Sequence, residues 1–244
     1  MTQASPVTPT ERLFEEDAYA TEGRATVVEV HPQGIILDRT LFYAESGGQP
    51  GDTGTLHLPD GRELAVRDTR YLPGKLRVVH VLDDPQAVSL GTELAFTVDW
   101  DRRYRHMRMH TCLHVLCGLV DAPVTGCSVN AARSRLDFDL PESVFTRETL
   151  DERLQAEIAA DRPVRHSWHT GAEVAAALAD ARTVKAPAVS DDTAVRMIEI
   201  GGLDLQPCGG THVRSTGELA GLRIGKIQKK SKHNRRISVV EDES

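Results

Sequence analysis

The sequence changes character at Asp99-Trp-Asp-Arg-Arg-Tyr-Arg-His-Met-Arg-Met-His110-Thr-Cys-Leu-His114. From this stretch onward, apolar residues such as Tyr104, Met107 and Leu116 recur at helical spacing, and an aspartate at its start is a suitable N-cap. We therefore predict a helix over residues 101–120. His110 and His114 are four positions apart, so their imidazoles lie on one face of that helix, one turn from each other.

The residues before this helix have the pattern of short strands separated by turns. β-Branched and aliphatic residues alternate there with Gly-, Pro- and Asp-rich segments, of which residues 46–51 are the longest. Many short strands with regular turns are typical of a small antiparallel β-barrel, which we predict for residues 1–98. The predicted strands are 25–30, 34–38, 54–58, 63–68, 76–82 and 94–98.

The residues from 99 to 244 mix helical and strand patterns. We predict an α+β domain in this half, with helices packed on a mainly antiparallel sheet. The further helices are expected at 146–161 and 170–181. The expected strands are 126–130, 134–139, 163–168, 194–200, 221–229 and 235–240.

A second motif, Cys208-Gly-Gly-Thr-His212, complements the helical histidine pair. Three imidazoles and one thiolate form a ligand set suited to zinc, so we predict a Zn²⁺ site at His110, His114, Cys208 and His212. A metalloprotease helix needs a glutamate directly after its first histidine, and Thr111 stands there instead. A structural zinc site with a closed coordination sphere remains an alternative.

Composition limits the function classes. Of 244 residues, 40% are hydrophobic and 27% are charged, as in ordinary globular proteins. No apolar run is long enough for a membrane span, and the N-terminus lacks a secretory signal, so we expect a cytoplasmic protein with no membrane partner. The net charge is -7. Nevertheless, basic residues cluster at 102–108 and 226–236, and phosphate groups respond to such local patches.

Three stretches resemble a known family. Residues 42–54 resemble the glycine-rich segment that precedes the editing domain of alanyl-tRNA synthetase. Residues 98–110 resemble the entry to its first metal motif, and residues 206–218 resemble its second. The resemblance runs from about residue 24 to the C-terminus, and the aminoacylation half of a synthetase has no counterpart. The chain is similar to the freestanding alanyl-tRNA editing proteins of the AlaX type, in the longer form that keeps the barrel.

This resemblance implies a zinc-dependent deacylase acting on tRNA(Ala) mischarged with serine, and it leaves open whether the glycine ester is also a substrate. It implies a barrel domain with a glycine-rich loop at 1–98 and an editing domain at 99–244. Thr125 stands where the family is thought to recognise the serine hydroxyl, and with His110 and Cys208 it forms the predicted catalytic set. Val124 replaces a glutamine of the synthetase-embedded domains, which bears on water positioning and substrate preference.

The glycine-rich loop and the basic clusters supply the expected contacts to substrate or tRNA. These residues are Gly47, Gly48, Gln49, Asp52, Arg103, Arg108, Lys229, Lys230, Arg235 and Arg236. Two other classes of function stay open on the sequence: a tRNA-binding module stabilised by zinc without catalysis, and a metal-dependent hydrolase of small esters or amides. The oligomeric state is also open.

Overall fold

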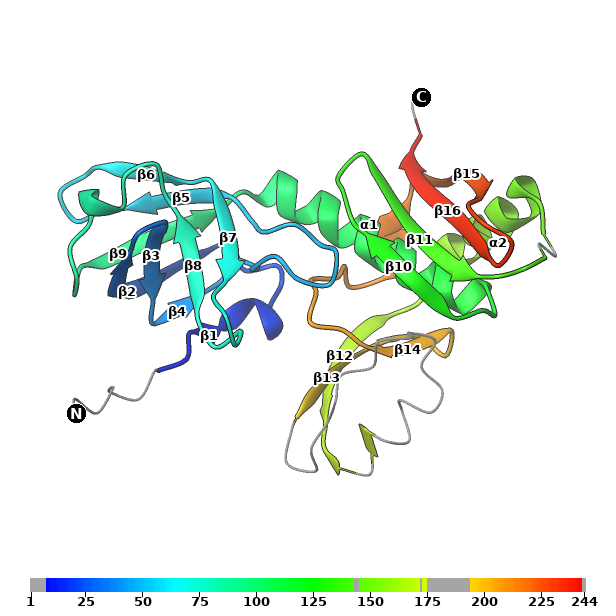
Figure 1. The fold of residues 1–244 in the computed structure, drawn as a ribbon, viewed down its shortest axis with the longest axis horizontal. Coiled ribbons are helices and arrows are strands. Elements are labelled where there is room, and N and C mark those ends of the chain that lie inside the picture. Colours follow the sequence, from blue (N-terminus) through cyan, green and yellow to red (C-terminus); the bar gives the residue numbers. More distant parts are fainter. Residues whose placement is uncertain (1–7, 143–144, 172, 175–193, 243–244) are drawn as a thin grey trace. The chain divides into compact units, whose positions relative to one another are not determined.

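The computed structural model describes residues 8–142, 145–171, 173–174 and 194–242 (Figure 1). By its internal contacts the chain divides into two units. Unit 1 consists of Met1–Ser46 and Pro50–Arg103, and unit 2 consists of Gly47–Gln49 and Tyr104–Ser244. Three residues of the glycine-rich loop therefore belong to the second unit.

Unit 1 is built on a seven-stranded sheet in which every paired neighbour is antiparallel. Its order is β6-β5-β9-β2-β3-β8-β7, and the long strand β2 lies at the centre. The bounds are β2 (Glu22–His31), β3 (Gly34–Leu37), β5 (Gly54–His57), β6 (Glu63–Val66), β7 (Asp68–Tyr71), β8 (Val78–Val81) and β9 (Glu93–Val98). Two short strands, β1 (Glu11–Arg12) and β4 (Arg39–Thr40), form a separate parallel pair.

The predicted closed barrel is not confirmed. Strands β6 and β7 end the order at opposite sides, and no ladder joins them within residues 8–103. The predicted strand 63–68 is in fact the start of a longer extended segment, which pairs first with β5 and then, after Arg67, with β8. Apolar residues of this sheet, including Val27, Ile35, Leu56 and Phe96, form one core together with Phe42 of the segment after β4.

Helix α1 (Trp100–Leu119) confirms the predicted helix at the change of pattern. Asp99 precedes it and caps it, because its carboxylate accepts a hydrogen bond of 3.2 Å from the backbone N–H of Arg102. The predicted second helix is α2 (Arg147–Ala159), whose capping box is formed by Thr146 and Thr149. Leu150, Leu154 and Ile158 form the buried stripe of α2.

The four-stranded antiparallel sheet of unit 2 has the order β10-β11-β16-β15. Its strands are β10 (Val124–Ser128), β11 (Arg133–Asp139), β15 (Leu222–Lys229) and β16 (Asn234–Glu241). Helix α2 packs on β15, and Gln155 and Asp151 of the helix hydrogen-bond the backbone of that strand. Together with α1, this arrangement agrees with the predicted α+β class.

Alternation along β11 gives this sheet two different faces. Ser134, Leu136 and Phe138 are buried on one face, whereas Arg135 and Asp137 lie on the other. Directly paired residues share a face, so Cys127 lies with Leu136 and Ser128 lies with Arg135. The register thus assigns Cys127 to the buried face.

A third sheet in unit 2 joins β12 (Val164–His169), β13 (Val195–Ile200) and β14 (Asp204–Pro207) in antiparallel order. Strand β14 was not predicted, and it leads directly into the Cys208 motif. The helix predicted at 170–181 lies largely outside the described residues. Within the described part of the chain, no helix is long and apolar enough to cross a membrane.

Candidate metal centre

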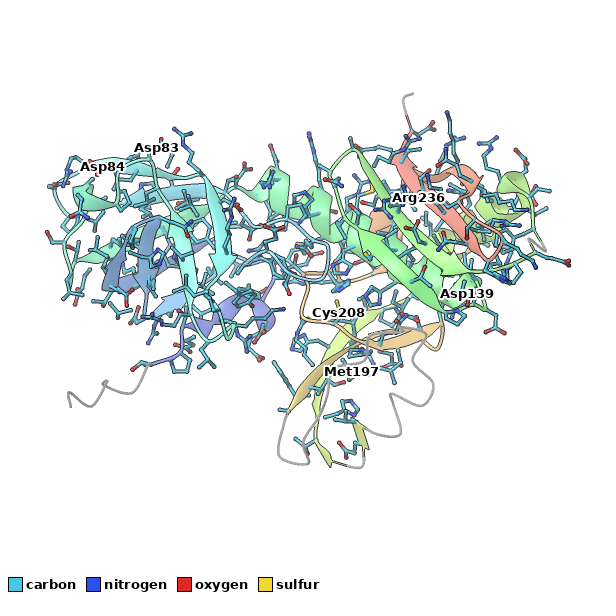
Figure 2. The ribbon with its side chains drawn as sticks, viewed as in Figure 1. Asp83, Asp84, Asp139, Met197, Cys208 and Arg236 are labelled. Atoms are coloured by element: carbon cyan, nitrogen blue, oxygen red, sulfur yellow. The ribbon has the colours of Figure 1, made fainter. Side chains whose placement is uncertain are left out.

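The two motifs meet in unit 2. His110 and His114 project from α1, and Cys208 and His212 come from the segment that follows β14; Figure 2 labels Cys208 there. One ligand atom of each residue lies within 4.8 Å of those of the other three. All three histidines are buried. Residues almost a hundred positions apart in the sequence therefore converge on one point.

The spacing of the donor atoms suits tetrahedral coordination. The Cys208 Sγ atom lies 3.6 Å from His110 Nε2 and 3.3 Å from His212 Nε2. Bond lengths of about 2.0 Å to nitrogen and about 2.3 Å to sulfur give tetrahedral edges of about 3.3 Å between nitrogens and about 3.5 Å between nitrogen and sulfur. These two distances therefore fit a tetrahedral site, and all four donor atoms lie within 4.8 Å of one another.

Each imidazole is oriented by a different partner at its Nδ1 atom. His110 Nδ1 lies 2.8 Å from Gln49 Oε1, His114 Nδ1 lies 3.0 Å from Asp204 Oδ2, and His212 Nδ1 lies 3.1 Å from Thr111 Oγ1. An N–H on each Nδ1 leaves Nε2 as a lone-pair donor toward the centre. Such outer partners fix the tautomer and the ring plane of metal-binding histidines.

The orientation of Gln49 is itself fixed. Its Nε2 donates to Thr211 Oγ1 at 2.8 Å, and its Oε1 accepts from the backbone N–H of Thr211 at 3.3 Å. The same Oε1 is therefore turned toward His110. Gln49 is fully buried and positions the ring of His110, and its predicted part in substrate or tRNA binding stays a prediction.

The Cys208–His212 turn is held by the buried Arg196. Its Nη1 donates to the carbonyls of Cys208 and Gly210, both at 2.9 Å. Gly210 is required by packing: a Cβ there would lie 2.3 Å from Cε1 and 2.5 Å from Nδ1 of His110. The adjacent Gly209 faces open space. One glycine of the pair thus permits the close approach of the ring, and the other does not contribute to it.

The electrostatics of the group favour a thiolate. Burial acts to raise the pKa of Cys208, but the nearby His110 and His212 outweigh it and lower that pKa well below its usual value. Burial lowers the pKa of His114, whereas hydrogen bonds to Asp204 and Cys208 outweigh burial and raise it to about 10. Burial and the neighbouring His110 lower the pKa of His212 to about 3. A metal cation bound beside the thiolate would displace the proton held by His114, so metal binding releases a proton.

A further cysteine lies near the centre. Burial and the charge of Cys208 raise the pKa of Cys127 to about 11, so this thiol stays protonated at neutral pH.

A metal ion can be held by the group of His110, His114, Cys208 and His212. Its mixed nitrogen and sulfur donors are those that bind transition metals rather than Mg²⁺ or Ca²⁺.

Thr125, the predicted serine-recognising residue, lies in an irregular part of β10. Its hydroxyl donates to the carbonyl of Asp137 at 3.1 Å and accepts from Asn234 Nδ2 at 2.9 Å. The residue is exposed, and among the described residues no contact joins it to the four donors. Its predicted role stays a prediction.

Residues of the glycine-rich loop differ in exposure, because Gln49 is buried whereas the two glycines before it are not. Gly47 and Gly48 are exposed with positive φ of 57° and 84°, a conformation that glycine adopts without strain. The carbonyl of Gly48 accepts a hydrogen bond of 2.7 Å from Val129. These two glycines remain candidates for substrate contact.

The burial of Asp52 and Arg103 contradicts their predicted contact with substrate or tRNA. Both side chains are fully buried in unit 1 and form an ion pair with each other. They are therefore not available to tRNA, and the basic cluster at 102–108 is smaller at the surface than its sequence suggests.

The other basic residues predicted to contact tRNA differ in their hydrogen bonds and ion pairs. Arg108 donates to the carbonyls of Glu218 and Ala220 and pairs with Glu241 at 2.6 Å, which is a structural role. Lys229 and Lys230 are exposed at the end of β15. Arg235 bonds the carbonyl of Pro141 at 2.6 Å, and Arg236 pairs with Asp137.

Sequence reasoning missed three residues that support the centre: Asp204, Arg196 and, as a partner of His212, Thr111. Asp204 and Arg196 lie in strands that contain no recognisable metal motif. Thr111 was noted only because a glutamate was lacking there. Its place between His110 and His114 was the available signal, since a helical neighbour of two ligands is well placed to orient a third.

Comparisons with known proteins agree with this geometry. Residues 195–238 match the second additional domain of threonyl and alanyl tRNA synthetases, and residues 11–102 match class II (A) tRNA synthetases. An alanine–tRNA ligase of Pyrococcus abyssi is 35% identical over 88% of this chain, but the match covers only 24% of the ligase.

Shorter relatives match from end to end. The alanyl-tRNA editing protein AlaX-M of Methanosarcina barkeri is 38% identical over 93% of this chain and 97% of its own length. That of Methanosarcina mazei is 37% identical over 93% of this chain and 95% of its own length. Because the match covers nearly the whole of both chains, this chain belongs to the AlaX-M family of alanyl-tRNA editing proteins.

Proposed function

We propose that this chain hydrolyses the ester bond of tRNA(Ala) mischarged with serine, and of tRNA(Ala) mischarged with glycine. The observation that carries the proposal is the convergence of three Nε2 atoms and one thiolate, with every Nδ1 already held by a different side chain. Family membership supports tRNA(Ala) as the partner, since the relatives are named as alanyl-tRNA editing proteins.

We infer that the ion is Zn²⁺, because three imidazoles and one thiolate are characteristic zinc ligands. When bound, the ion supplies Lewis acidity toward the ester carbonyl or an attacking water. His110, His114, Cys208 and His212 hold it, and the buried Gln49 and Asp204 keep two of the rings in place. Thr111 stands where a metalloprotease has its general base, but its hydroxyl contacts His212. That position therefore does not supply the proton acceptor.

A separate hydrolytic site has a physical reason. An aminoacylation pocket built for alanine discriminates weakly against a side chain that adds only a hydroxyl. We assign the hydrolysis to residues 99–244 and assign residues 1–98, apart from the loop that reaches the centre, to binding of the tRNA. Thr125 is the proposed contact for the serine hydroxyl, so Thr125→Val should slow removal of serine more than removal of glycine.

The direct test is hydrolysis of purified Ser-tRNA(Ala) and Gly-tRNA(Ala), with Ala-tRNA(Ala) and Ser-tRNA(Ser) as controls, before and after chelation. We expect metal-dependent loss of serine and glycine from tRNA(Ala) only. Metal analysis of the same samples identifies the ion. Turnover of free amino-acid esters at comparable rates would instead support a small-ester hydrolase.

Variants distinguish the loss of the metal centre from a general loss of the fold. His110→Ala and Cys208→Ala should each lose the bound metal and at least about a thousandfold in rate, because the group then lacks a donor. His166→Ala is the matched control, since His166 is exposed on β12 and outside the group. Normal deacylation by both centre variants would refute the mechanism.

One observation favours a second candidate, a zinc-stabilised tRNA-binding module. Four protein donors are enough to close a tetrahedral coordination sphere and leave no position for water. A zinc-replete, folded protein that binds tRNA(Ala) but releases none of the amino acids would establish that function in place of hydrolysis.

A further inference from the structure

A basic pocket lies on the four-stranded sheet of unit 2. Its volume is about 280 Å³, and it is lined by side chains from all four strands and the β10–β11 turn. Four of the lining residues are cationic: Arg133, Arg135, Lys226 and Arg236. The others include hydrogen-bonding neutral groups such as Ser128 and Gln228. Figure 2 labels Arg236 on this sheet.

The register shows that this pocket is separate from the metal centre. Ser128 pairs with Arg135, and Arg135 pairs with Ser238, so the lining residues share one face of the sheet. Cys127, which interacts electrostatically with Cys208, pairs with Leu136 on the opposite, buried face. The pocket and the centre therefore lie on different sides of β10.

The charge of the pocket is not balanced by its neighbours. Asp137 is shared, because it pairs with Arg135 at 2.6 Å and with Arg236 at 2.7 Å. Among the described residues, neither Arg133 nor Lys226 forms an ion pair. One carboxylate against four cations leaves three positive charges in excess, although the whole chain has a net charge of -7. An anion is the ligand that such a site attracts.

The arginines are arranged for binding rather than for solvation alone. Asp137 fixes two guanidinium groups at partly buried positions, with exposed side-chain fractions of 33% for Arg135 and 27% for Arg236. A fixed guanidinium loses little conformational entropy on binding and presents several donors in one plane. Planar, multidentate donors suit phosphate oxygens.

We propose that this pocket binds a phosphate of the RNA backbone and forms an RNA contact separate from the metal centre. The inference rests on the proposed function, in which the substrate is a tRNA. Gln228 pairs with Arg236 on the pocket face, so the next cation on this side of β15 is Lys230, about 13 Å from Lys226 at the rise of a strand. This length favours a chain of phosphates over a single small anion.

The test is binding of uncharged tRNA(Ala) to the full chain, followed by fluorescence anisotropy at several salt concentrations. The variant is Arg133→Ala with Lys226→Ala, because removing these two cations breaks no ion pair in the described structure. We expect Kd to rise about tenfold and the slope of log K against log salt to fall by about two. Metal content and the rate at saturating substrate should not change.

The matched control is Arg153→Ala with Arg165→Ala, two exposed cations of unit 2 outside the pocket. The assignment is wrong if the pocket variant has the same Kd and salt slope as this control. It is also wrong if AMP or inorganic phosphate binds the wild type through Arg133 and Lys226 while tRNA affinity does not depend on them.

The results that would refute the proposed function differ from those that would refute the pocket assignment. A wild-type chain without affinity for tRNA(Ala) would refute both proposals. A wild type that binds and hydrolyses Ser-tRNA(Ala), combined with a pocket variant equal to the control, would refute only the pocket assignment.

Discussion

Each unit contains a buried polar centre, and the two differ in kind: one is an ion pair, and the other is a group of metal-donor side chains. In unit 1 the guanidinium of Arg103 meets the carboxylate of Asp52 and also donates to the carbonyls of Ala18 and Leu41. In unit 2 three imidazoles and a thiolate turn their donor atoms toward one another. Burial of polar groups alone therefore does not indicate a ligand. Four metal-donor side chains that converge on one point do.

The largest effect on stability is expected from breaking the pair of unit 1. Asp52→Ala leaves the Arg103 charge buried without a partner, which should lower the free energy of unfolding by about 3–5 kcal/mol. Urea denaturation measures this loss. Asp60→Ala, which removes an exposed partner of Arg62, should leave the unfolding midpoint unchanged. If Asp52→Ala unfolds like Asp60→Ala, the contrast between the two centres does not hold.

The largest effect among the supporting residues of the metal group is expected at Gly210. Gly210→Ala places a Cβ within 2.5 Å of the His110 ring, so the ring must move and Zn²⁺ affinity should fall about 100-fold. Competition with a chromophoric chelator measures the affinity. Gly209→Ala is the matched control because its Cβ would face open space. Equal affinities for the two variants would show that the packing at Gly210 does not position His110.

A buried histidine outside the metal group provides a pH test. Burial lowers the pKa of His80 to about 4, and its ring lies 2.8 Å from Thr40 Oγ1. The unfolded chain binds this proton more readily, so the stability contribution is complete above pH 6.5 and is lost as pH falls toward 4. Between pH 8 and pH 5 the loss should be about 2 kcal/mol.

Denaturation of the wild type and of His80→Gln at both pH values isolates this contribution from that of the carboxylates. The variant should lose less stability on acidification than the wild type. An identical pH dependence of the two proteins would mean that His80 is not kept neutral by burial.

The smallest effect is expected from Asp204→Asn, which keeps the shape of the side chain but removes its charge. The amide oxygen can still accept from His114 Nδ1, so Zn²⁺ affinity should fall only about tenfold. The same chelator competition measures it. A loss as large as that of Cys208→Ala would make Asp204 a ligand rather than a positioning residue.

Local patterns predicted most of the elements correctly. The period of Tyr104, Met107 and Leu116 identified α1, and strand alternation identified β11 and β16, because both signals arise within one element. Strand β14 was missed because Asp204–Pro207 is short and polar. Closure of the predicted barrel was not confirmed, since pairing of β6 or β7 depends on distant strands.

The residues of the candidate site that lie in recognisable motifs could be predicted from the sequence. The spacing of His110 and His114 and the Cys208–His212 motif indicated the four donors. Arg103 was misread, because a run of cations does not show that one of them is buried against Asp52, whereas the predicted tRNA contact of Arg108 stays a prediction. Asp204 carries no motif, so only the fold shows it.

The assignment of Gly47–Gln49 to unit 2 has a consequence for how this protein can be shortened. A fragment that starts at residue 99 keeps all four donors but lacks Gln49, so Nδ1 of His110 loses its partner. A version of this chain without residue 49 therefore needs a water molecule or another side chain as the partner of that ring. A cut between two continuous halves of the sequence therefore separates residues that belong to one compact unit.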